Sequence, residues 1–270
     1  MICYPNAKIN LGLKVVFKRT DGYHNLESIF LPIDLCDVLE VIPSEGDDIR
    51  LTVHGIQVTG DASDNLVVKA YHLIKSKYDI GGVEVHLLKN IPTGSGMGGG
   101  SSDGVFMLKA LCELFDLEVS HQEMFHWALK LGSDCPFFLY NQPCFVSGRG
   151  EEIEPLTMDL SDYDVRVVHP GIHISTAGAF AKIMPSPNPV DLKHAATFDA
   201  SEWPKVFSND FQNHAMESSP MISEIIHVLY NAGALYASMT GSGSAVYGVF
   251  RKNTVLDFTM PYFIRDCRFL

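Results

Sequence analysis

Residues 92–103 read Pro-Thr-Gly-Ser-Gly-Met-Gly-Gly-Gly-Ser-Ser-Asp, and five of these residues are glycine. An alternating apolar run at residues 83–88 precedes them, and a helical pattern of apolar residues follows at residues 101–115. The stretch is therefore predicted to be a loop that joins a strand to a helix. Glycines let consecutive backbone N–H groups turn toward one anion, and a helix start adds partial positive charge. We interpret the loop as a cradle for a polyphosphate; a flexible turn is the alternative.

The loop does not fit the commonest phosphate-binding motifs. Gly94, Gly96 and Gly99 match the G-x-G-x-x-G spacing of dinucleotide-binding folds, which is a weak signal by itself. The strand before the loop is not the first of the chain, Pro92 interrupts the turn, and the acidic residues about 20 positions on belong to a helix. No lysine follows the glycines as in a Walker A loop, and the sequence lacks the H-R-D and D-F-G motifs of protein kinases. We therefore expect a different nucleotide-phosphate fold.

The rest of the chain predicts a mixture of strands and helices. Residues 1–55 have the alternation and turn residues of a sheet. The polar stretch at residues 148–164 is the best candidate for a domain boundary, and residues 184–190 are rich in Pro and Asn. The individual elements are expected as strands at residues 7–11, 28–33, 38–42, 49–53, 144–147 and 165–169, helices after Asn65, after Ser120 and over residues 219–231, and a hairpin over residues 235–250.

Composition indicates a compact globular protein. The 270 residues suit one large or two modest domains, and 46% hydrophobic against 19% charged residues supply a core. Lys and Arg number 20 and Asp and Glu 32, so the net charge is −12. This balance argues against a protein that binds nucleic acid or an anionic membrane as its main activity. An anionic ligand must therefore be held by local groups.

The first residues and the cysteines are those expected of a cytoplasmic protein. No apolar stretch approaches the ~20 residues of a membrane span, and the first residues lack the features of a signal peptide. The six cysteines contain no C-x-x-C pair, so we expect them to be reduced and mostly buried. The eleven histidines show no H-E-x-x-H spacing, and a zinc site is not expected.

Two further segments complete a set of three motifs. They are Pro5-Asn-Ala-Lys8-Ile-Asn10-Leu and Met239-Thr-Gly-Ser-Gly-Ser-Ala245, and with residues 92–103 they resemble the signature motifs of the GHMP kinase superfamily. The resemblance implies an α+β, two-domain GHMP kinase fold. Its N-terminal domain, residues 1–146, would bind ATP and have the fold of the second domain of ribosomal protein S5. Its C-terminal domain, residues 147–270, would have a ferredoxin-like fold. We expect a cytoplasmic transferase that is a monomer or weak homodimer.

Other segments narrow the resemblance. Within the superfamily the chain is most similar to the members that phosphorylate the 2-hydroxyl of a cytidine-diphosphate-linked methylerythritol in the non-mevalonate isoprenoid pathway. One alternative is another GHMP kinase, acting on mevalonate, homoserine or a sugar. Another is a nucleotide-binding regulator without catalysis, which the presence of both Lys8 and Asp134 disfavours. The narrower resemblance rests on residues 19–24 (Arg-Thr-Asp-Gly-Tyr-His), 64–66 (Asp-Asn-Leu), 132–138 (Gly-Ser-Asp-Cys-Pro-Phe-Phe), 169–171 (His-Pro-Gly) and 209–210 (Asn-Asp).

The resemblance implies two catalytic residues. A hydroxyl that attacks a γ-phosphate needs a base within hydrogen-bond reach and positive charge for the phosphate oxygens. Asp134 would take the alcohol proton, and Lys8 would lower the pKa of Asp134 and steady the transferring group. The alternatives are a helix or turn cap for Asp134 and a solvated strand lysine for Lys8. Cys135 is expected to be a packing residue.

The substrate residues come from the same resemblance. Tyr23 and Phe180 would sandwich the cytosine, His24 would read its edge, and Asn10 would lie near the methylerythritol hydroxyls. The third motif would approach the diphosphate or the diol, with an ordinary hairpin turn as its alternative. Phe180 is alternatively a core aromatic. The full expected set is Asn10, Tyr23, His24, Thr176, Phe180, Gly241 and Ser242.

ATP would be bound mainly by the glycine-rich loop. Asn65 would contact adenine or its ribose, with a helix cap as the alternative, and the Lys89 ammonium would reach ATP unless it is a solvated strand end. Mg²⁺ is expected with ATP, and the Ser102 hydroxyl is a candidate ligand. Asp103 stands where the motif often has Ala or Asn, and its negative charge must point away or meet a cation. The expected ATP-binding set is Asn65, Lys89, Pro92, Gly94, Ser95, Gly96, Gly98, Gly99, Gly100, Ser101 and Ser102.

Overall fold

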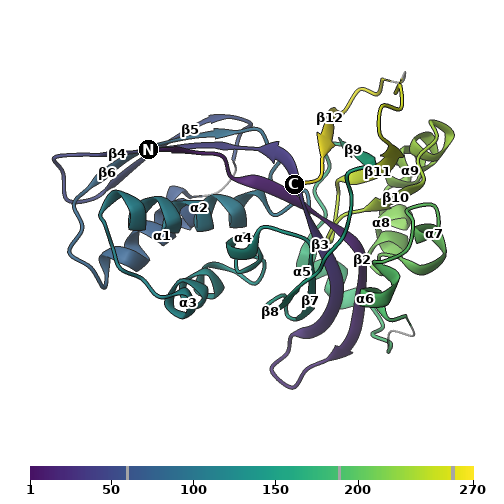
Figure 1. The fold of residues 1–270 in the computed structure, drawn as a ribbon, viewed down its shortest axis with the longest axis horizontal. Helices are drawn as coiled ribbons and strands as arrows, with labels where there is room; N and C mark the ends of the chain where they lie inside the picture. The colour runs from purple at the N-terminus through teal and green to yellow at the C-terminus, as the bar shows by residue number, and fades with distance from the viewer. Residues whose placement is uncertain (59–60, 188–189, 257–258) are drawn as a thin grey trace. The chain divides into compact units, whose positions relative to one another are not determined.

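The computed structural model describes residues 1–58, 61–187, 190–256 and 259–270, so part of the Pro/Asn-rich stretch at residues 184–190 lies outside the described residues. The chain forms two compact units (Figure 1). Unit 1 contains residues 1–7, 35–93 and 98–141. Unit 2 contains residues 8–34, 94–97 and 142–270. The backbone passes between the units several times, so each unit is built from segments that are distant in sequence.

Unit 1 is a sheet covered by helices. The strand order is β1-β4-β6-β5, with β5 parallel to β6 and the other pairs antiparallel. A parallel pair needs a crossover connection, and helix α1 supplies it. Helices α1 and α2 lie side by side along the sheet (Figure 1). The elements are β1 (Ile2–Cys3), β4 (Val38–Pro43), β5 (Ile49–Gly55), η1 (Ala62–Asp64), α1 (Leu66–Lys75), β6 (Val83–Lys89), α2 (Gly99–Leu114), α3 (His121–Leu131) and α4 (Phe137–Tyr140).

Unit 2 contains two sheets. The first has the order β2-β3-β7-β8 and the second the order β10-β11-β9-β12. The first two residues of β2 and the last two of β3 belong to unit 1. Helix α9 packs on β10 and β11, and its buried Ile222, Ile225 and Leu229 join the core of this unit. The elements are β2 (Asn6–Lys18), β3 (His24–Cys36), β7 (Cys144–Gly148), β8 (Glu152–Pro155), β9 (Tyr163–His169), β10 (Tyr236–Met239), β11 (Val246–Arg251), β12 (Phe263–Arg268), α5 (Thr176–Lys182), α6 (Leu192–Ala195), α7 (Trp203–Val206), α8 (Gln212–Ser218) and α9 (Pro220–Asn231).

The elements expected from sequence are present. Helix α3 begins after Ser120, whose side chain accepts a hydrogen bond from the Glu123 N–H, and the expected hairpin is the antiparallel pair β10–β11. Strand β8 lies in the polar stretch that was expected to be a boundary, where it pairs with β7 inside unit 2. The domain limits 1–146 and 147–270 remain a prediction, because the compact units follow contacts and interleave along the chain.

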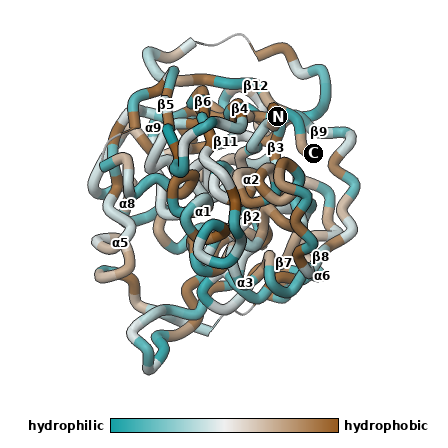
Figure 2. The backbone as a smooth tube through the Cα atoms, turned by 90° about the vertical axis from the view of Figure 1, so that its left-hand side faces the viewer, coloured by the Kyte–Doolittle hydropathy of each residue, from teal (hydrophilic) through white to brown (hydrophobic). Residues whose placement is uncertain are grey.

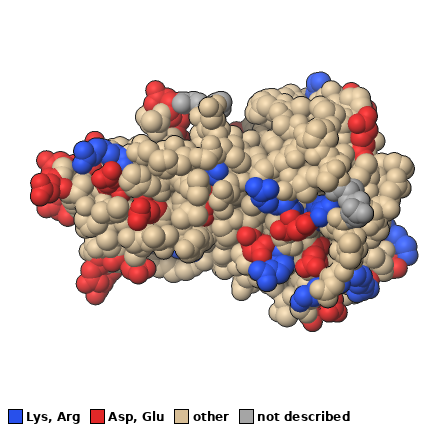
Figure 3. Space-filling view, turned by 90° about the horizontal axis from the view of Figure 1, so that it is seen from above, with Lys and Arg blue, Asp and Glu red and all other residues tan. Residues whose placement is uncertain are grey.

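Side-chain character varies along the backbone in short stretches. Figure 2 shows hydrophobic and hydrophilic residues alternating along the tube. Among the described residues, no helix combines the length and the hydropathy that crossing a bilayer requires. The face in Figure 3 carries acidic clusters together with interspersed basic side chains, in keeping with the net charge of −12. The described residues on this face form no continuous basic surface of the kind that binds nucleic acid.

Candidate active site

Strand β2 presents two different buried faces. Successive side chains of a strand point to opposite sides, so Ala7, Ile9 and Leu11 enter the core with no exposed surface. The intervening Lys8 and Asn10 are also buried, at 2% and 1% exposure. Charged and amide groups are costly to bury unless they are paired, so this polar face indicates a functional site. The alternative that Lys8 is a solvated lysine is wrong.

A hydrogen-bond network surrounds Lys8 in unit 2. The Lys8 Nζ donates to Asn10 Oδ1 at 2.6 Å and lies 4.4 Å from the centroid of the Phe30 ring. The Asn10 Nδ2 donates to Ser28 Oγ at 3.0 Å, and the Thr240 hydroxyl donates to Asn10 Oδ1 at 3.1 Å. Two expected site residues, Lys8 and Asn10, are thereby held together. Thr240 belongs to the third motif, and Ser28 is a member of the network that the sequence did not indicate.

The first part of the glycine-rich loop packs on the third motif. The Lys8 N–H donates to the Met97 carbonyl at 2.9 Å, and the Ala245 N–H donates to the Ser95 carbonyl at 3.1 Å. A Cβ added to Gly96 would lie 2.1 Å from the Thr240 carbonyl oxygen. Backbone therefore meets backbone at Gly96, and only glycine fits there.

Asn209 fixes the third motif. Its Nδ2 donates to the carbonyls of Met239 at 2.8 Å and Gly241 at 2.9 Å, and its Oδ1 accepts from the Phe211 N–H. The Asn-Asp pair at residues 209–210 contributed to the family resemblance, but no role could be assigned to it from sequence. The third motif is also the turn between β10 and β11, as its alternative interpretation expected.

Thr176 and Ser242 lie next to each other. Their hydroxyl oxygens are 2.9 Å apart, which joins the start of helix α5 to the third motif. Both were expected substrate residues, and Gly241 is adjacent to Ser242. The structure therefore brings these three expected residues into one cluster of unit 2.

Aromatic rings form a second cluster in unit 2. The His24 and Phe180 rings stack with centroids 5.1 Å apart, and Phe180 meets Phe211 edge-on at 4.8 Å. Phe180 also packs against the hydrophobic core, so the core interpretation is supported in part. Tyr23 is 54% exposed, and the Arg149 guanidinium covers its ring at 4.2 Å from the centroid. Arg149 is therefore a stacked arginine, a cation–π arrangement that the sequence did not predict.

Helix α2 offers its N-terminus at the end of the glycine-rich loop in unit 1. Gly98 precedes the helix in the left-handed conformation, with φ of 71°, and no described side chain caps the helix start. The first backbone N–H groups of an uncapped helix are available to an anion. A Cβ at Gly99 would lie 2.8 Å from Ile91 Cγ2, so glycine permits the close approach of α2 to the segment that follows β6.

Lys89 lies in a buried ion-pair cluster. It is 3% exposed, and its ammonium donates to Asp37 and to Asp103, so the alternative of a solvated strand end is wrong. Burial opposes the charge of Lys89, but attraction to Asp103 and Asp37 outweighs burial and raises the Lys89 pKa. Burial, reinforced by Asp37, raises the pKa of Asp103 to about 7 despite the attraction of Lys89. The negative charge of Asp103 thus meets a cation.

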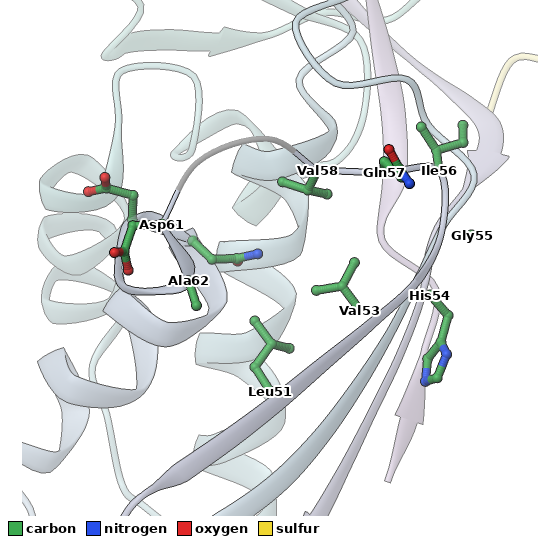
Figure 4. A pocket seen from close by; sticks show the side chains of 11 residues that line it. Leu51, Val53, His54, Gly55, Ile56, Gln57, Val58, Asp61 and Ala62 are labelled. Carbon is green, nitrogen blue, oxygen red and sulfur yellow. The ribbon is translucent and has the colours of Figure 1, made fainter.

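Asn65 lies at a pocket of unit 1. Its Oδ1 accepts a hydrogen bond from the Val67 N–H at 2.9 Å, so the helix-cap interpretation is confirmed. The pocket has a volume of about 440 Å³, within the range of small-molecule sites. Figure 4 shows Leu51, Val53 and Val58 directed toward the same space, opposite the turn that carries Asp61. An apolar wall beside polar groups suits a planar heterocycle.

Asp134 lies in the turn between α3 and α4, as the Gly and Pro residues around it predicted. The neighbouring Cys135 has no exposed surface, and burial raises the pKa of its thiol to about 12. A thiol of this kind is not a nucleophile at neutral pH, which supports a packing role for Cys135. Asp134 belongs to unit 1 and Lys8 to unit 2, so their convergence remains a prediction.

The Ser102 hydroxyl is a candidate metal ligand in the loop region. The Ser102 Oγ is buried and has no hydrogen-bond partner within the described residues. No group of three or more His, Cys, Asp or Glu side chains with metal-binding geometry occurs in the part of the chain that the structure describes.

Comparisons with known protein families and with individual proteins identify the same family for this chain. The profile described as "GHMP kinases N terminal domain" matches residues 65–142, and the profile "GHMP kinases C terminal" matches residues 191–257. A Bacteroides thetaiotaomicron protein named 4-diphosphocytidyl-2-C-methyl-D-erythritol kinase is 44% identical, and the match covers 96% of this chain and 95% of the relative. An Azobacteroides pseudotrichonymphae protein of the same name is 46% identical, with coverage of 93% and 94%.

Solved structures agree with these relatives. A crystal structure of 4-(cytidine 5'-diphospho)-2C-methyl-D-erythritol kinase is 31% identical with a TM-score of 0.76, and the match covers 92% of this chain and 89% of the other. The mevalonate kinase of Methanococcus jannaschii has a TM-score of 0.71 over 100% of this chain and 98% of its own, at 14% identity. The second likeness concerns the fold alone. The expected fold class is confirmed by both comparisons.

Proposed function

The chain belongs to the GHMP kinase family, and on that premise we propose that it phosphorylates 4-diphosphocytidyl-2-C-methyl-D-erythritol with ATP. The γ-phosphoryl group passes to the 2-hydroxyl, which gives the 2-phosphate and ADP in the non-mevalonate route to isoprenoid precursors. The observation that carries this proposal is the 44% identity to a kinase of that name over 96% of the chain. The buried Lys8–Asn10 network and the aromatic cluster supply chemistry suited to the same reaction.

Phosphoryl transfer to an alcohol needs a proton acceptor and stabilised phosphate charge. We assign the acceptor role to Asp134: its carboxylate takes the hydroxyl proton as the alcohol oxygen bonds to the γ-phosphorus and the bond to ADP breaks. We assign the Lys8 ammonium to the developing negative charge. The Asn10 side chain holds that ammonium at 2.6 Å, so its position is fixed before the reaction.

ATP is assigned to the glycine-rich loop and the pocket beside Asn65. The loop supplies backbone N–H groups from Gly94 to Ser102, including those at the start of α2. The pocket of about 440 Å³ next to Asn65 receives the adenine. Lys89 remains an expected ATP-binding residue that lies directly before this loop.

Filling this pocket should weaken ATP binding. Val53→Trp is expected to raise the KM for ATP about tenfold, because the indole occupies the space assigned to adenine and a tenfold change needs only ~1.4 kcal/mol. Thr52→Trp is the matched control, since adjacent strand residues point to opposite faces. Steady-state kinetics with ATP varied would measure both variants. Equal KM values for the two would remove adenine from this pocket.

Mg²⁺ fits the residues that are present. The Ser102 Oγ, which has no hydrogen-bond partner among the described residues, is an oxygen donor of the kind this ion takes. Mg²⁺ commonly keeps one or two protein ligands beside phosphate and water oxygens. When bound, the ion neutralises the β- and γ-phosphate oxygens. Ser102 would hold it from the first turn of α2.

The cytidine is assigned to the aromatic cluster. Tyr23 and Phe180 supply the stacking faces and His24 the edge contacts, while Thr176, Gly241 and Ser242 approach the diphosphate or diol. Tyr23 is 54% exposed and the Arg149 guanidinium lies over its ring, so we assign to this exposed ring a stacking contact with the base. The present His24–Phe180 stack shows that both rings share one region of unit 2.

Removing the Tyr23 ring should act on substrate binding. Stacking of a base on an aromatic ring contributes ~1–3 kcal/mol, so Tyr23→Ala should raise the KM of the cytidylyl substrate by about 5-fold to 100-fold. Tyr23→Phe should retain the native KM because it keeps the ring. Tyr4→Ala removes another exposed tyrosine and serves as the control. An unchanged KM in Tyr23→Ala would point to a different base pocket.

A substrate panel decides between this function and its rivals. Turnover of the cytidylyl substrate would be compared with that of mevalonate, homoserine and galactose by following ADP release. Preference for the cytidylyl alcohol is expected, and failure to phosphorylate it would retire the proposal. ATP binding without transfer to any alcohol would support a regulator instead.

The partner of this enzyme is a small molecule. We propose that it acts in the cytoplasm as a monomer or weak homodimer, without a nucleic-acid or membrane partner. Its net charge of −12 supports this, because an anionic protein gains nothing from contact with anionic polymers or lipid surfaces.

A further inference from the structure

Two buried aspartates, Asp37 and Asp103, hold Lys89, which precedes the glycine-rich loop in the chain. The Lys89 Nζ donates to Asp103 Oδ2 at 2.7 Å and also donates to Asp37 Oδ2. The exposed fractions are 3% for the Lys89 and Asp103 side chains and 0% for Asp37. A cluster with this burial is shielded from solvent, so its charges interact strongly.

Asp37 also binds the backbone that leads into the loop. Its Oδ1 accepts hydrogen bonds from the N–H groups of Asn90 at 2.6 Å and Ile91 at 2.9 Å. The Asn90 side chain adds a bond to the Cys36 carbonyl at 2.9 Å. Asp37 therefore fixes the last residues before Pro92 through both of its oxygens.

Asp103 belongs to the opposite end of the loop, in the first turns of α2. The start of α2 also lies close to the end of β6 and the residues after it. A Cβ on Gly99 would lie 2.8 Å from Ile91 Cγ2 and 3.4 Å from Lys89 Nζ. Lys89 thus connects the residues before the loop with the helix after it. The connection lies wholly inside unit 1.

We propose that Asp103 and Asp37 are positioning residues, which hold the Lys89 ammonium so that the two ends of the glycine-rich loop keep a fixed spacing. This inference rests on the proposed function only in taking the loop as the ATP site. The geometry of backbone N–H groups toward a phosphate depends on where the loop ends are held, and misplacement by about 1 Å can cost ~10²-fold. Asp103 acts through Lys89 and does not itself contact ATP in this proposal.

Asp103→Ala and Asp103→Asn test the proposal together. Alanine leaves the ammonium without its second acceptor, so kcat/KM for ATP should fall about 10-fold to 100-fold. The KM of the cytidylyl substrate should stay within about twofold, since the groups assigned to it belong to unit 2 and share no contact with Asp103 among the described interactions. Asparagine keeps a carbonyl oxygen toward Lys89 and should restore kcat/KM for ATP to within about threefold. Glu113→Gln removes one charge from an exposed position of the same helix and is the control.

Amide hydrogen exchange provides a readout that does not need kinase activity. In Asp103→Ala, peptides covering residues 89–103 should exchange about tenfold faster than in the native chain, while the sheets of unit 2 keep native rates. A fluorescent ATP analogue titrated into each variant gives affinity directly. These two measurements remain informative even if the cytidylyl alcohol proves not to be the substrate.

Two results would overturn the proposal. One is native ATP affinity and native exchange in a folded Asp103→Ala protein. The other is an equal loss of ATP affinity in Asp103→Asn and Asp103→Ala. That result would show that ATP binding depends on the negative charge at position 103 and not on the hydrogen bond to Lys89. If Asp103→Ala does not fold, Asp103→Ser replaces it, since its hydroxyl is one bond shorter than the carboxylate.

Discussion

Asp134→Asn should lower kcat by about 10²–10⁴-fold while ATP affinity stays within about twofold of the native value. The amide has nearly the same shape as the carboxylate, so packing of the turn between α3 and α4 is retained. It cannot accept the proton of the attacking hydroxyl. The loss therefore falls on the chemical step, which single-turnover measurements at saturating ATP would resolve from binding.

The control for this variant is Asp116→Asn. Asp116 is an exposed residue of the same unit with φ of 52°, a conformation that asparagine also adopts readily. The same chemical change should leave kcat within about twofold there, as surface substitutions usually do. Near-native turnover in Asp134→Asn would remove Asp134 from proton transfer and leave stabilisation of the phosphate charge by Lys8 as the principal catalytic effect.

Much of the fold could be predicted because local pattern and burial agree. The apolar positions 7, 9 and 11 of β2 alternate as a strand requires, and all three have no exposed surface. The helix after Ser120 begins at a residue whose side chain caps it. The glycine-rich loop follows a strand and starts a helix, as its composition indicated. In each case the information lies within about ten residues of the feature.

The partners of the site residues could not be predicted because they are distant in sequence. Lys89 looked equally like an ATP contact and a solvated strand end, and only the strand pairing that brings Asp37 beside it explains its burial. Asn209 supports Gly241 across 32 positions, and Thr240 meets Asn10 across 230. No periodicity or spacing rule relates such positions. Tertiary packing alone sets them.

Short elements were missed for a related reason. Helices α6 and α7 contain four residues each, and strand β8 also has four. A period of 3.6 residues cannot repeat within one turn, so the hydrophobic pattern carries little signal. Their stability comes from neighbours, as with Trp203 of α7, which is 1% exposed and packs on Tyr236 of β10.

Gly96→Ala should be the most damaging single-methyl change in the loop. Gly96 has φ of 80°, which L side chains rarely adopt, and the new Cβ would lie 2.1 Å from the Thr240 carbonyl oxygen. That neighbour is backbone and cannot rotate away. Conformational strain and overpacking together should reduce the free energy of unfolding by about 3 kcal/mol or more. The kcat/KM for ATP should fall about 10²-fold, because the loop and the third motif can no longer pack together.

Gly81→Ala is the control for Gly96→Ala, because it adds the same methyl group at a position where there is room for it. A Cβ added to Gly81 would meet no atom of the described residues within 4 Å, and its φ lies outside the left-handed region. The alanine variant should therefore unfold at the native denaturant midpoint or slightly above it. Denaturant unfolding and ATP kinetics on both proteins make the comparison. The prediction would be wrong if Gly96→Ala matched Gly81→Ala in both stability and ATP kinetics. The loop would then take another path at Gly96, with room for a side chain beside Thr240.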